Sequence, residues 1–282
     1  MSLTIKFYDV EHGSCTHIIT PNGKHFLVDI GTKSDKSICQ HVKNNHLTYG
    51  VRIDYLIITH PHIDHIADLG GLFTYNIKPH TLRRPRAAFP LQTVYTDTKA
   101  QMALKKLANE MDAEYNSAVT VDPDLPSNNG GVEMVFFDPE VSESEKSDIN
   151  NFSNVIIMKY AGFKVVLTGD NPSAKLTTML QQYEFRQAIA DATVLLAPHH
   201  GRDSDYCDDF VRAANPLLTV FSDKAIQHET QAHAAQKYYT HTRGVKWNGS
   251  ERYIFTTRSD GTITFCFRSS DDWSINTSST EY

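Results

Sequence analysis

Short runs in which apolar and polar residues alternate open the chain and predict β-strands. These runs span 4–10, 15–20 and 25–30, and a Pro-Asn-Gly turn at 21–23 separates the last two. Strands that lie this close in sequence pair most simply with their neighbours. We therefore expect an antiparallel meander at the N-terminal end of the chain.

Further along, apolar runs without alternation predict strands that are buried on both faces. Between these runs, apolar residues at helical spacing predict helices. Strands are expected at 53–59, 132–137, 155–160, 163–167, 193–197 and 217–221. Helices are expected at 34–46, 66–73, 97–115, 173–185, 207–214 and 230–241. Ser34 or Asp35 is the expected cap of the first helix, and a terminal hairpin is expected to join 253–257 to 262–267.

The order of these elements predicts an α/β protein. Both halves of the chain run from strands to helices, which fits a four-layer αβ/βα sandwich with a site along one edge of its two sheets. We expect one domain over residues 1–268. Residues 269–282 are rich in Ser, Thr and Asp and are expected to form a flexible tail.

The composition is that of an ordinary globular protein, with 282 residues of which 40% are hydrophobic and 21% are charged. No apolar run approaches the roughly 20 residues that a spanning helix needs. The N-terminus lacks the apolar core of a signal peptide, and the four cysteines form no C-x-x-C pair. We therefore expect a cytoplasmic protein with no membrane partner. The net charge of −6 argues against non-specific coating of nucleic acid, but it leaves room for a local basic surface.

The densest group of potential metal ligands directly follows the buried strand at 53–59. The run H-P-H-I-D-H supplies His60, His62, Asp64 and His65 within six residues. Imidazole and carboxylate ligands suit Zn²⁺, Mn²⁺ or Fe²⁺, in a single or a paired site. A His-rich surface loop is the alternative, but the strand before the run and the helical segment after it favour a metal site.

Other strands end in residues of the same kind. Asp170 follows a Thr-Gly pair after the strand at 163–167, where a carboxylate either bridges two cations or serves as a turn residue. His199 and His200 follow another strand and precede a glycine. Asp29 ends the strand at 25–30, where it either orients a ligand histidine or is again a turn residue.

In these motifs the chain resembles the metallo-β-lactamase superfamily, and within it the soluble β-lactamase-like domain of ComEC-type DNA-uptake proteins. The D-V-E-H-G-S-C segment at 9–15, the H-x-H-x-D-H run, the T-G-D aspartate and the H-H-G at 199–201 follow the order of that family. The segment 228–233 lies where the group carries an N-x-x-x-H-P element. The resemblance covers residues 4 to 267 and implies the four-layer αβ/βα metallo-β-lactamase-like sandwich.

The resemblance also implies two neighbouring cation positions. The metal ligands that it implies are His60, His62, Asp64, His65, Asp170 and His200. The first two would bind one cation, the next two would bind the second, and Asp170 would bridge both. The implied cofactors are two divalent ions, Zn²⁺ or Mn²⁺, with Mg²⁺ also compatible. His200 is the preferred ligand of its pair and His199 would contact substrate, although the opposite order stays open.

One feature of many family members is missing. They carry a histidine before the strand that leads to the T-G-D aspartate, whereas residues 150–154 read Asn-Asn-Phe-Ser-Asn here. The first cation position is then one imidazole short, and water or an Asn carbonyl would complete it. Such a position favours Mn²⁺ or Mg²⁺ over Zn²⁺. Asn151 and Asn154 are equally well explained as turn residues.

We expect metal-assisted hydrolysis of a phosphodiester, by a nuclease or phosphodiesterase. The expected catalytic residues are Asp64, His199 and His233. Asp64 would orient the attacking water, while His228 or His233 would donate a proton to the leaving oxygen. His233 is alternatively a structural residue of its helix. Arg83, Arg84 and Arg86 have two possible roles. They are expected either to contact the substrate or to form only a solvated loop.

Two other functions stay open because one fold hosts many chemistries. The first is hydrolysis of a small ester, lactone, thioester or phosphorylcholine-type substrate, which the net charge of −6 favours. The second is a metal-stabilised subunit that is non-catalytic or is activated by a partner in a larger assembly. The expected partners are thus a nucleic acid or a small phosphodiester, and in the last case another protein. The sequence does not indicate the oligomeric state.

Overall fold

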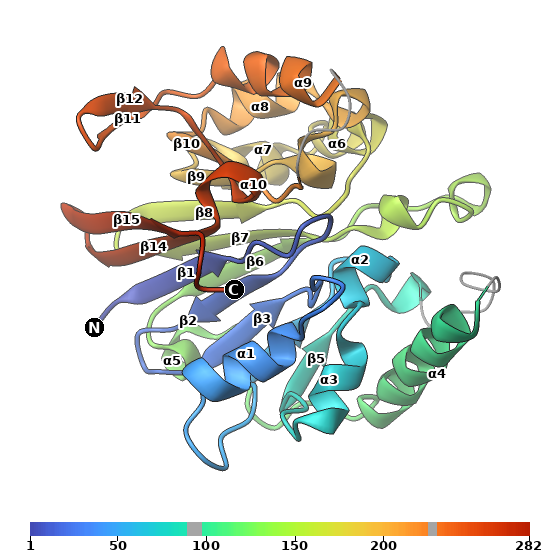
Figure 1. Cartoon of the computed structure of the whole chain (residues 1–282). Helices are drawn as coiled ribbons and strands as arrows, with labels where there is room; N and C mark the ends of the chain where they lie inside the picture. The colour runs from blue at the N-terminus through green and yellow to red at the C-terminus, as the bar shows by residue number, and fades with distance from the viewer. Residues whose placement is uncertain (89–97, 225–229) are drawn as a thin grey trace.

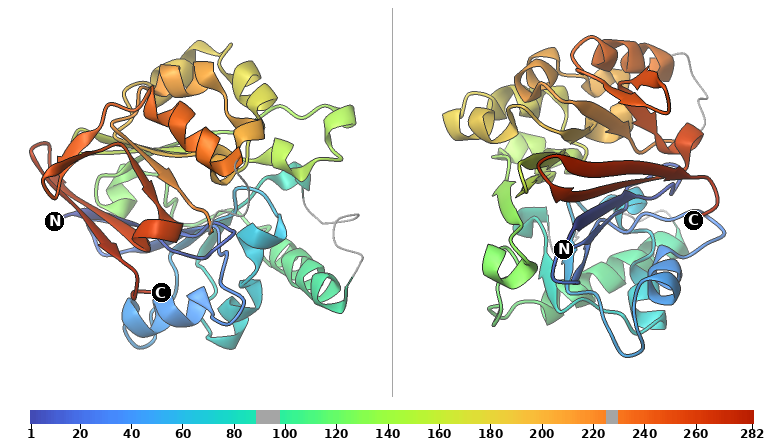
Figure 2. Two further views of the ribbon diagram at one scale, coloured as in Figure 1. Left: turned by 45° about the horizontal axis from the view of Figure 1, so that its top comes forward. Right: turned by 90° about the vertical axis from the view of Figure 1, so that its left-hand side faces the viewer.

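Two large β-sheets pack face to face at the centre of the molecule, with helices on both outer faces (Figures 1 and 2). The computed structural model describes residues 1–88, 98–224 and 230–282. Within that part of the chain the first sheet has the strand order β15-β14-β1-β2-β3-β4-β5. The second sheet has the order β13-β10-β9-β8-β7-β6.

The first sheet is antiparallel from β15 to β3, and it is parallel from β3 to β5. Its strands are β1 (Leu3–Phe7), β2 (Thr16–Ile19), β3 (His25–Val28), β4 (Tyr55–Ile57), β5 (Thr81–Arg83), β14 (Thr262–Ser269) and β15 (Asp272–Ser278). The expected N-terminal meander is therefore confirmed as β1-β2-β3.

The second sheet mixes the two directions in the same way. Strands β6 to β8 pair antiparallel, and β8, β9, β10 and β13 are parallel. Its strands are β6 (Glu133–Phe137), β7 (Val155–Tyr160), β8 (Phe163–Leu167), β9 (Val194–Leu196), β10 (Leu218–Phe221) and β13 (Ile254–Thr256). A small separate hairpin consists of β11 (Val245–Trp247) and β12 (Ser250–Arg252).

The alternation of side chains explains how the layers bury their apolar surface. In β1, Leu3, Ile5 and Phe7 point into the core between the two sheets, while Thr4 and Lys6 are only half-buried. A strand with one such face must cover it against a second layer. In β9 every residue is buried, as the continuous apolar run predicts, because this strand lies between a sheet and a helical layer.

The helices form the outer layers. The first sheet is covered by α1 (Ile38–Asn45), α3 (Leu69–Thr74) and α4 (Lys99–Glu114), whose apolar residues share one buried cluster with Leu27 and Leu56. The second sheet is covered by α6 (Ser173–Met179), α7 (Tyr183–Ile189), α8 (Asp208–Ala214) and α9 (Thr230–Tyr239). The layers therefore run αβ/βα, as expected.

Several helix boundaries differ from the expected ones. The first helix begins at Ile38 because Ser37, and not Ser34 or Asp35, accepts a hydrogen bond from the main-chain N–H of Gln40. The segment expected as one helix at 66–73 is divided into α2 (Ile63–Ile66) and α3. Likewise, the helix expected at 173–185 is divided into α6 and α7.

The expected terminal hairpin is wrong. Strand β13 pairs with β10 in the second sheet, whereas β14 pairs with β1 in the first sheet. Between them lies the short helix α10 (Thr257–Asp260), which ends at Gly261 with φ of 69°. A Cβ at this position would lie 2.3 Å from the carbonyl oxygen of Ser278, so the crossing of the chain between the sheets requires glycine here.

The C-terminal segment is ordered and not a flexible tail. Strand β15 pairs with β14 from Thr262–Ser278 to Ser269–Asp272, and Trp273 packs its ring against Phe163 at a centroid distance of 5.8 Å. Tyr282 is buried in the cluster beneath the first sheet. Composition alone does not reveal this strand, because its order depends on pairing with β14 and on Trp273 and Ile275, which pack against the core between the sheets.

In the part of the chain that the structure describes, no helix combines the length and the apolar character needed to cross a bilayer.

Candidate metal centre

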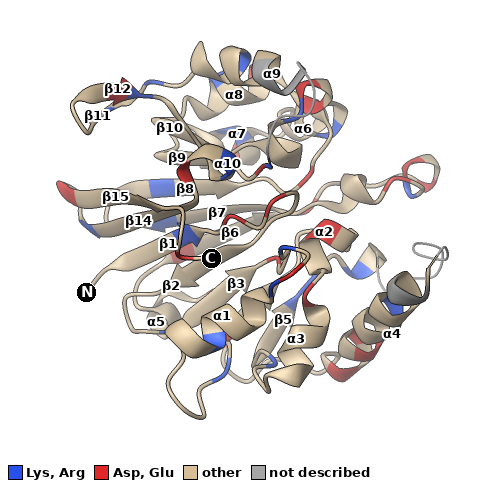
Figure 3. Cartoon of the chain, in the orientation of Figure 1, with Lys and Arg blue, Asp and Glu red and all other residues tan. Residues whose placement is uncertain are grey.

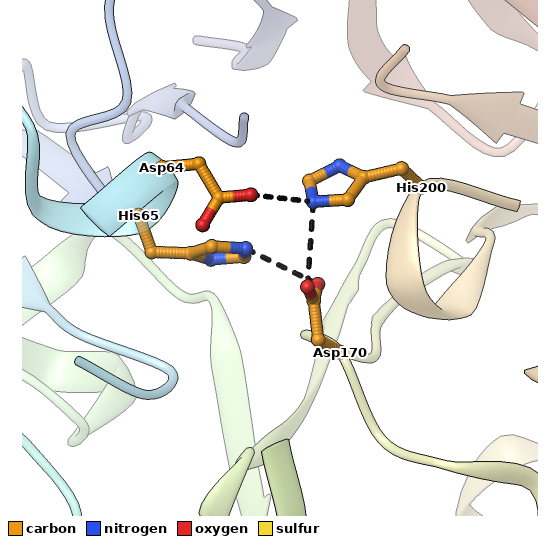
Figure 4. Close-up of side chains that lie close together, drawn as sticks. All are labelled: Asp64, His65, Asp170 and His200. Atoms are coloured by element: carbon orange, nitrogen blue, oxygen red, sulfur yellow. Dashed lines mark ion pairs between the residues drawn. The ribbon is translucent and has the colours of Figure 1, made fainter. Parts of the chain in front are cut away.

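Four of the expected ligands, Asp64, His65, Asp170 and His200, meet where strands of both sheets end (Figure 4). The segment after β4 carries His60 and His62, and α2 carries Asp64 and His65. Asp170 follows β8 in the second sheet. Residues from opposite sheets are thus brought together at one edge of the sandwich.

Four side chains form the tightest group. The Nε2 atom of His65 lies 3.1 Å from Oδ1 of Asp170, and Nε2 of His200 lies 3.3 Å from Oδ2 of Asp170 and 3.3 Å from Oδ2 of Asp64. Two ligands that each bind one ion at about 2.1 Å are separated by roughly 3–3.6 Å. The spacing therefore suits a single divalent cation between these atoms.

Buried atoms without partners give an independent test of that fit. The Nε2 atoms of His65 and His200 are buried and make no hydrogen bond of acceptable geometry within the described residues. An unsatisfied buried polar atom costs about 1–3 kcal/mol unless something pairs with it. Both atoms face the same carboxylate, so a cation bound there would satisfy both. The residues present fit a divalent metal ion.

Hydrogen bonds on the far side of each ring fix these two histidines. The Nδ1 atom of His65 lies 2.7 Å from Oδ2 of Asp29, and Asp29 itself accepts hydrogen bonds from the main-chain N–H and the hydroxyl of Thr59, both at 2.8 Å. The Nδ1 atom of His200 lies 2.8 Å from the carbonyl oxygen of Ser222. Such contacts orient a metal ligand and fix its tautomer. Asp29 therefore occupies the orienting position that was one of its two expected roles.

The second pair of expected ligands, His60 and His62, lies beside this group. The Nε2 atom of His60 is 3.1 Å from Nδ1 of His62 and 3.9 Å from Oδ2 of Asp170. In the Asn/Ser segment, the Ser153 hydroxyl accepts a hydrogen bond of 3.1 Å from the main-chain N–H of Asp170. Asn154 donates through Nδ2 to Asp138, and its Oδ1 is buried without a partner. Within this segment, Ser153 therefore helps to hold the main chain at Asp170.

The backbone around the adjacent histidines is unusual. His199 has φ of 47° and His200 has φ of 57°, so both adopt the left-handed region in the turn η4 (Pro198–Gly201). As a result, both side chains face Asp170. The Nε2 atom of His199 lies 3.6 Å from Oδ2 of Asp170, and its Nδ1 lies 2.7 Å from Oδ2 of Asp205.

Charges in this group are strongly coupled. Although burial alone would lower the pKa of His65 and of His200, the Asp170 carboxylate raises both, that of His200 to about 9. In the same way, burial would raise the pKa of Asp170, but the two imidazoles hold it well below its usual range. The imidazoles and carboxylates therefore favour one another's charged forms here, and a divalent cation would supply the positive charge that the carboxylates attract.

The structure does not bring all the expected site residues together. His233 lies on the exposed face of α9, where it lines a hollow with Tyr206, Asp208 and Lys237. His228 lies outside the described residues. A role for His233 as proton donor stays a prediction.

The three arginines are engaged with other groups. Arg84 is buried with its Nε 2.6 Å from Oδ1 of Asp112, and Arg83 lies 3.5 Å from Asp124. Arg86 donates to Asn116. Together the arginines line a cavity of about 550 Å³ that Asn154 also borders.

Two residues near the centre were not among the expected site residues. His12 lies in the loop after β1, with Nε2 3.6 Å from Oδ2 of Asp64 and 3.2 Å from Nη2 of Arg202. Burial lowers the pKa of His12 to about 4. Asp205 follows the adjacent histidines by only a few residues, but nothing in its sequence context distinguishes it from a helix-start aspartate.

Comparison with known proteins identifies the family of this chain. The model of the metallo-β-lactamase superfamily matches residues 8–171. A search of curated proteins finds no match.

Solved structures share the fold. The metallo-β-lactamase fold protein YhfI from Bacillus subtilis has a TM-score of 0.52 at 14% identity, covering 92% of this chain and 98% of that one. CmlA from Streptomyces venezuelae, a diiron β-hydroxylase, has a TM-score of 0.53 at 14% identity, covering 93% of this chain and 53% of its own. With the family model spanning more than half of the sequence, the chain belongs to the metallo-β-lactamase superfamily.

Proposed function

We propose that this protein is a metal-dependent hydrolase that cleaves phosphodiester bonds, as a nuclease or phosphodiesterase. The observation that carries the proposal is the convergence of His65, His200 and Asp64 on the carboxylate of Asp170. Bound divalent cations, Zn²⁺ or Mn²⁺ with Mg²⁺ also compatible, would activate water and neutralise the charge that develops on the substrate. The proposed set is two such ions, of which Asp64, His65, Asp170 and His200 would hold one, while His60 and His62 lie beside them.

The residues of the chain have separate tasks in this proposal. Asp64 faces both His200 and His12, which supports a role for its carboxylate in orienting the attacking water as well as in binding metal. Asp29 and the carbonyl of Ser222 keep the ligand rings in place. A preorganised group of this kind loses little energy to reorganisation during reaction.

The motif resemblance to ComEC-type domains supports a phosphodiester substrate. It rests on the segment at 9–15 and on the H-H-G at 199–201, and it makes nucleic acid one candidate substrate. A small phosphodiester is the other candidate, bound by the same chemistry.

The second candidate function is hydrolysis of a small ester, lactone, thioester or phosphorylcholine-type compound. The charge distribution favours such a small substrate. In the described part of the chain, Lys and Arg are scattered among Asp and Glu and do not gather along one element (Figure 3). Arg83 and Arg84 are paired with carboxylates, so they offer little free positive charge to a long polyanion.

The experiment compares substrates under defined metal loading. Purified protein with Mn²⁺, Mg²⁺ or Zn²⁺ is incubated with linear DNA, circular DNA, bis(p-nitrophenyl) phosphate and p-nitrophenyl acetate. Asp170→Asn is the test variant and His80→Gln, at an exposed position, is the matched control. Phosphodiester turnover that requires metal and Asp170 supports the proposal. Turnover of the carboxylic ester alone favours the second candidate, and turnover of nothing favours a subunit that is inactive or activated by a partner.

A further inference from the structure

A second group of potential metal ligands lies apart from the metal centre. It consists of His41, His46 and Glu281, each of which offers a ligand atom within 4.8 Å of those of the other two. His41 lies in α1, His46 is the C-cap of that helix, and Glu281 follows β15. The family model matches residues 8–171, so Glu281 lies beyond the matched region. We call this group the outer histidine site.

The outer histidine site lies on the face of the first sheet that points away from the second sheet. In β1, Phe7 points into the core between the sheets, so Lys6 and its register partner His17 in β2 point to the opposite face. The helix α1 covers this face, and the carbonyl of Tyr282 accepts a hydrogen bond from Lys36 just before that helix (Figures 1 and 2). The metal centre, in contrast, lies at the edge where strands of both sheets end.

His41 presents a buried nitrogen to this site. Its Nε2 is buried and makes no hydrogen bond within the described residues. The amide nitrogen of Asn45 lies 2.9 Å from the main-chain oxygen of His41 and 3.2 Å from Nδ1 of its ring. Because the shorter contact goes to the main chain, the neutral ring can carry its proton on Nδ1, which leaves the lone pair on Nε2. An unsatisfied buried nitrogen is unfavourable, and a cation would satisfy this one.

His46 lies at one end of a chain of hydrogen bonds. The hydroxyl oxygen of Tyr8 lies 3.0 Å from Nε2 of His46 and 3.2 Å from Nδ1 of His17. In turn, Nε2 of His17 lies 3.0 Å from Nδ1 of His25. A hydroxyl has one proton to donate. When Tyr8 donates it to His17, two atoms with lone pairs, Nε2 of His46 and the Tyr8 oxygen, lie 3.0 Å apart. Two ligands of one zinc ion have roughly this spacing, about 3–3.6 Å.

Glu281 supplies the carboxylate of the site. Its Oε1 lies 4.0 Å from Nε2 of His46, and both side chains are only partly exposed. Nζ of Lys6 donates to the same oxygen at 2.6 Å. This ammonium group orients the carboxylate, but it also competes with a cation for the negative charge. Removal of Lys6 should therefore strengthen cation binding, which would not follow if Glu281 were only the partner of Lys6.

We propose that His41, His46 and Glu281 bind a divalent transition-metal ion, of which Zn²⁺ is the best suited, and that this ion joins the C-terminal segment to α1. Imidazole and carboxylate ligands suit zinc, and a water or the Tyr8 oxygen would complete a four-coordinate site. Binding would draw the ligand atoms together to the spacing of roughly 3–3.6 Å. The ion would stabilise the fold and take no part in turnover, so the inference does not depend on the proposed function.

The test counts bound zinc and measures its affinity. Metal-free protein is titrated with Zn²⁺ by calorimetry, and the ions retained after desalting are counted by elemental analysis. The variants are His41→Gln, His46→Gln, Glu281→Gln and Lys6→Met, and His80→Gln, at an exposed position, is the matched control. Circular dichroism and thermal melting of the metal-free proteins verify that each variant folds.

We expect one ion fewer per chain in His41→Gln and His46→Gln than in the wild type and His80→Gln. Glu281→Gln should weaken the binding of this ion by at least about tenfold, and Lys6→Met should strengthen it by about tenfold. Wild-type ion numbers and affinities in both histidine variants would overturn the inference, and so would weaker binding in Lys6→Met. Loss of an ion in His80→Gln would also overturn it, because zinc would then bind exposed histidines without a defined site.

The variant Asp170→Asn separates this site from the metal centre. In that background Zn²⁺ should still raise the melting temperature, because an ion that binds only the folded state stabilises it. Addition of His46→Gln should reduce this increase. An increase that His46→Gln leaves unchanged would place the stabilising ion elsewhere and overturn the inference. None of these measurements requires hydrolysis, so a failure of the phosphodiesterase proposal would leave the outer histidine site unaffected.

Discussion

Asp29 directly follows strand β3, and His65 lies in helix α2. Their side chains meet, with Oδ2 of Asp29 2.7 Å from Nδ1 of His65. Because Asp29 holds the far nitrogen, Nε2 of His65 is presented to Asp170 at 3.1 Å. Asp29 itself has φ of 58°, a conformation that Asn and Asp tolerate better than other residues.

The first prediction concerns this pair. Asp29→Asn keeps the backbone conformation but replaces a charged acceptor by a neutral amide. We expect the affinity for divalent metal to fall about 10–100-fold, measured by calorimetric titration. Asp54→Asn is a control outside the site, where the carboxylate accepts from the main-chain N–H of His25. Unchanged metal affinity in Asp29→Asn would show that the orientation of His65 does not depend on Asp29.

A second prediction concerns the pH dependence of metal binding. A histidine binds metal only after losing its proton, and Asp170 raises the pKa of His200 to about 9 against the opposing effect of burial. The cation must therefore displace protons at neutral pH. We expect the affinity for Mn²⁺ to rise about tenfold per pH unit for each displaced proton between about pH 6.5 and 8.5. Calorimetry in two buffers of different ionisation enthalpy counts the protons, and an affinity independent of pH would contradict the expected coupling.

A third prediction concerns stability in acid, away from the metal centre. The hydroxyl of Tyr8 lies 3.0 Å from Nε2 of His46 and 3.2 Å from Nδ1 of His17. Burial lowers the pKa of His46 to about 4 and that of His17 well below its usual range. In the unfolded chain a histidine has a pKa of about 6.5. The unfolded state therefore binds protons more tightly, and stability falls as the pH drops from about 6.5 toward 4.

Urea unfolding at pH 7 and pH 5 measures this effect. The free energy of unfolding should differ between pH 7 and pH 5, and His46→Gln should reduce that difference by about 1 kcal/mol. This figure allows for the partial exposure of the ring. His80→Gln, at an exposed position, should leave it unchanged. Equal pH dependence in wild type and His46→Gln would rule out this source of acid sensitivity.

A fourth prediction concerns the ordered C-terminal segment. The main-chain carbonyl of Tyr282 accepts hydrogen bonds from Nζ of Lys36 at 2.9 Å and from Nζ of Lys33 at 3.2 Å. The hydroxyl of Tyr282 forms a hydrogen bond with the hydroxyl of Thr32. Its ring is buried against Tyr8. We expect Tyr282→Ala to lower the free energy of unfolding by about 2–4 kcal/mol, while Tyr49→Ala, at a fully exposed position, should change it by less than about 0.5 kcal/mol. Similar stabilities in the two variants would mean that the segment does not contribute to the fold.

The part of the fold that the sequence predicts is the part with local signals. Continuous apolar runs such as Val194–Leu196 identify buried strands, and alternation identifies β1. The pairing of β13 and β14 with different sheets has no local signal, because it depends on contacts between residues far apart in the chain. The Ser- and Thr-rich β15 is also missed, since its order depends on pairing with β14 and on packing of Trp273.

The candidate site divides in the same way. The ligands that follow strand ends can be recognised from the sequence, because each lies directly after an apolar run. The separate orientations of His199 and His200 cannot, since they follow from left-handed backbone conformations in η4. The contact of His199 with Asp205, and that of His12 with Asp64, also depend on the tertiary structure.

The central claim is that metal held around Asp170 drives phosphodiester hydrolysis. The most direct measurement is the rate of bis(p-nitrophenyl) phosphate hydrolysis as metal-free protein is titrated with Mn²⁺ or Zn²⁺, for the wild type and Asp170→Asn. The account predicts no turnover without metal, turnover that rises to saturation as two ions bind per chain, and a loss of at least about 100-fold in Asp170→Asn. Turnover in the metal-free protein, or an unchanged rate in Asp170→Asn, would contradict it.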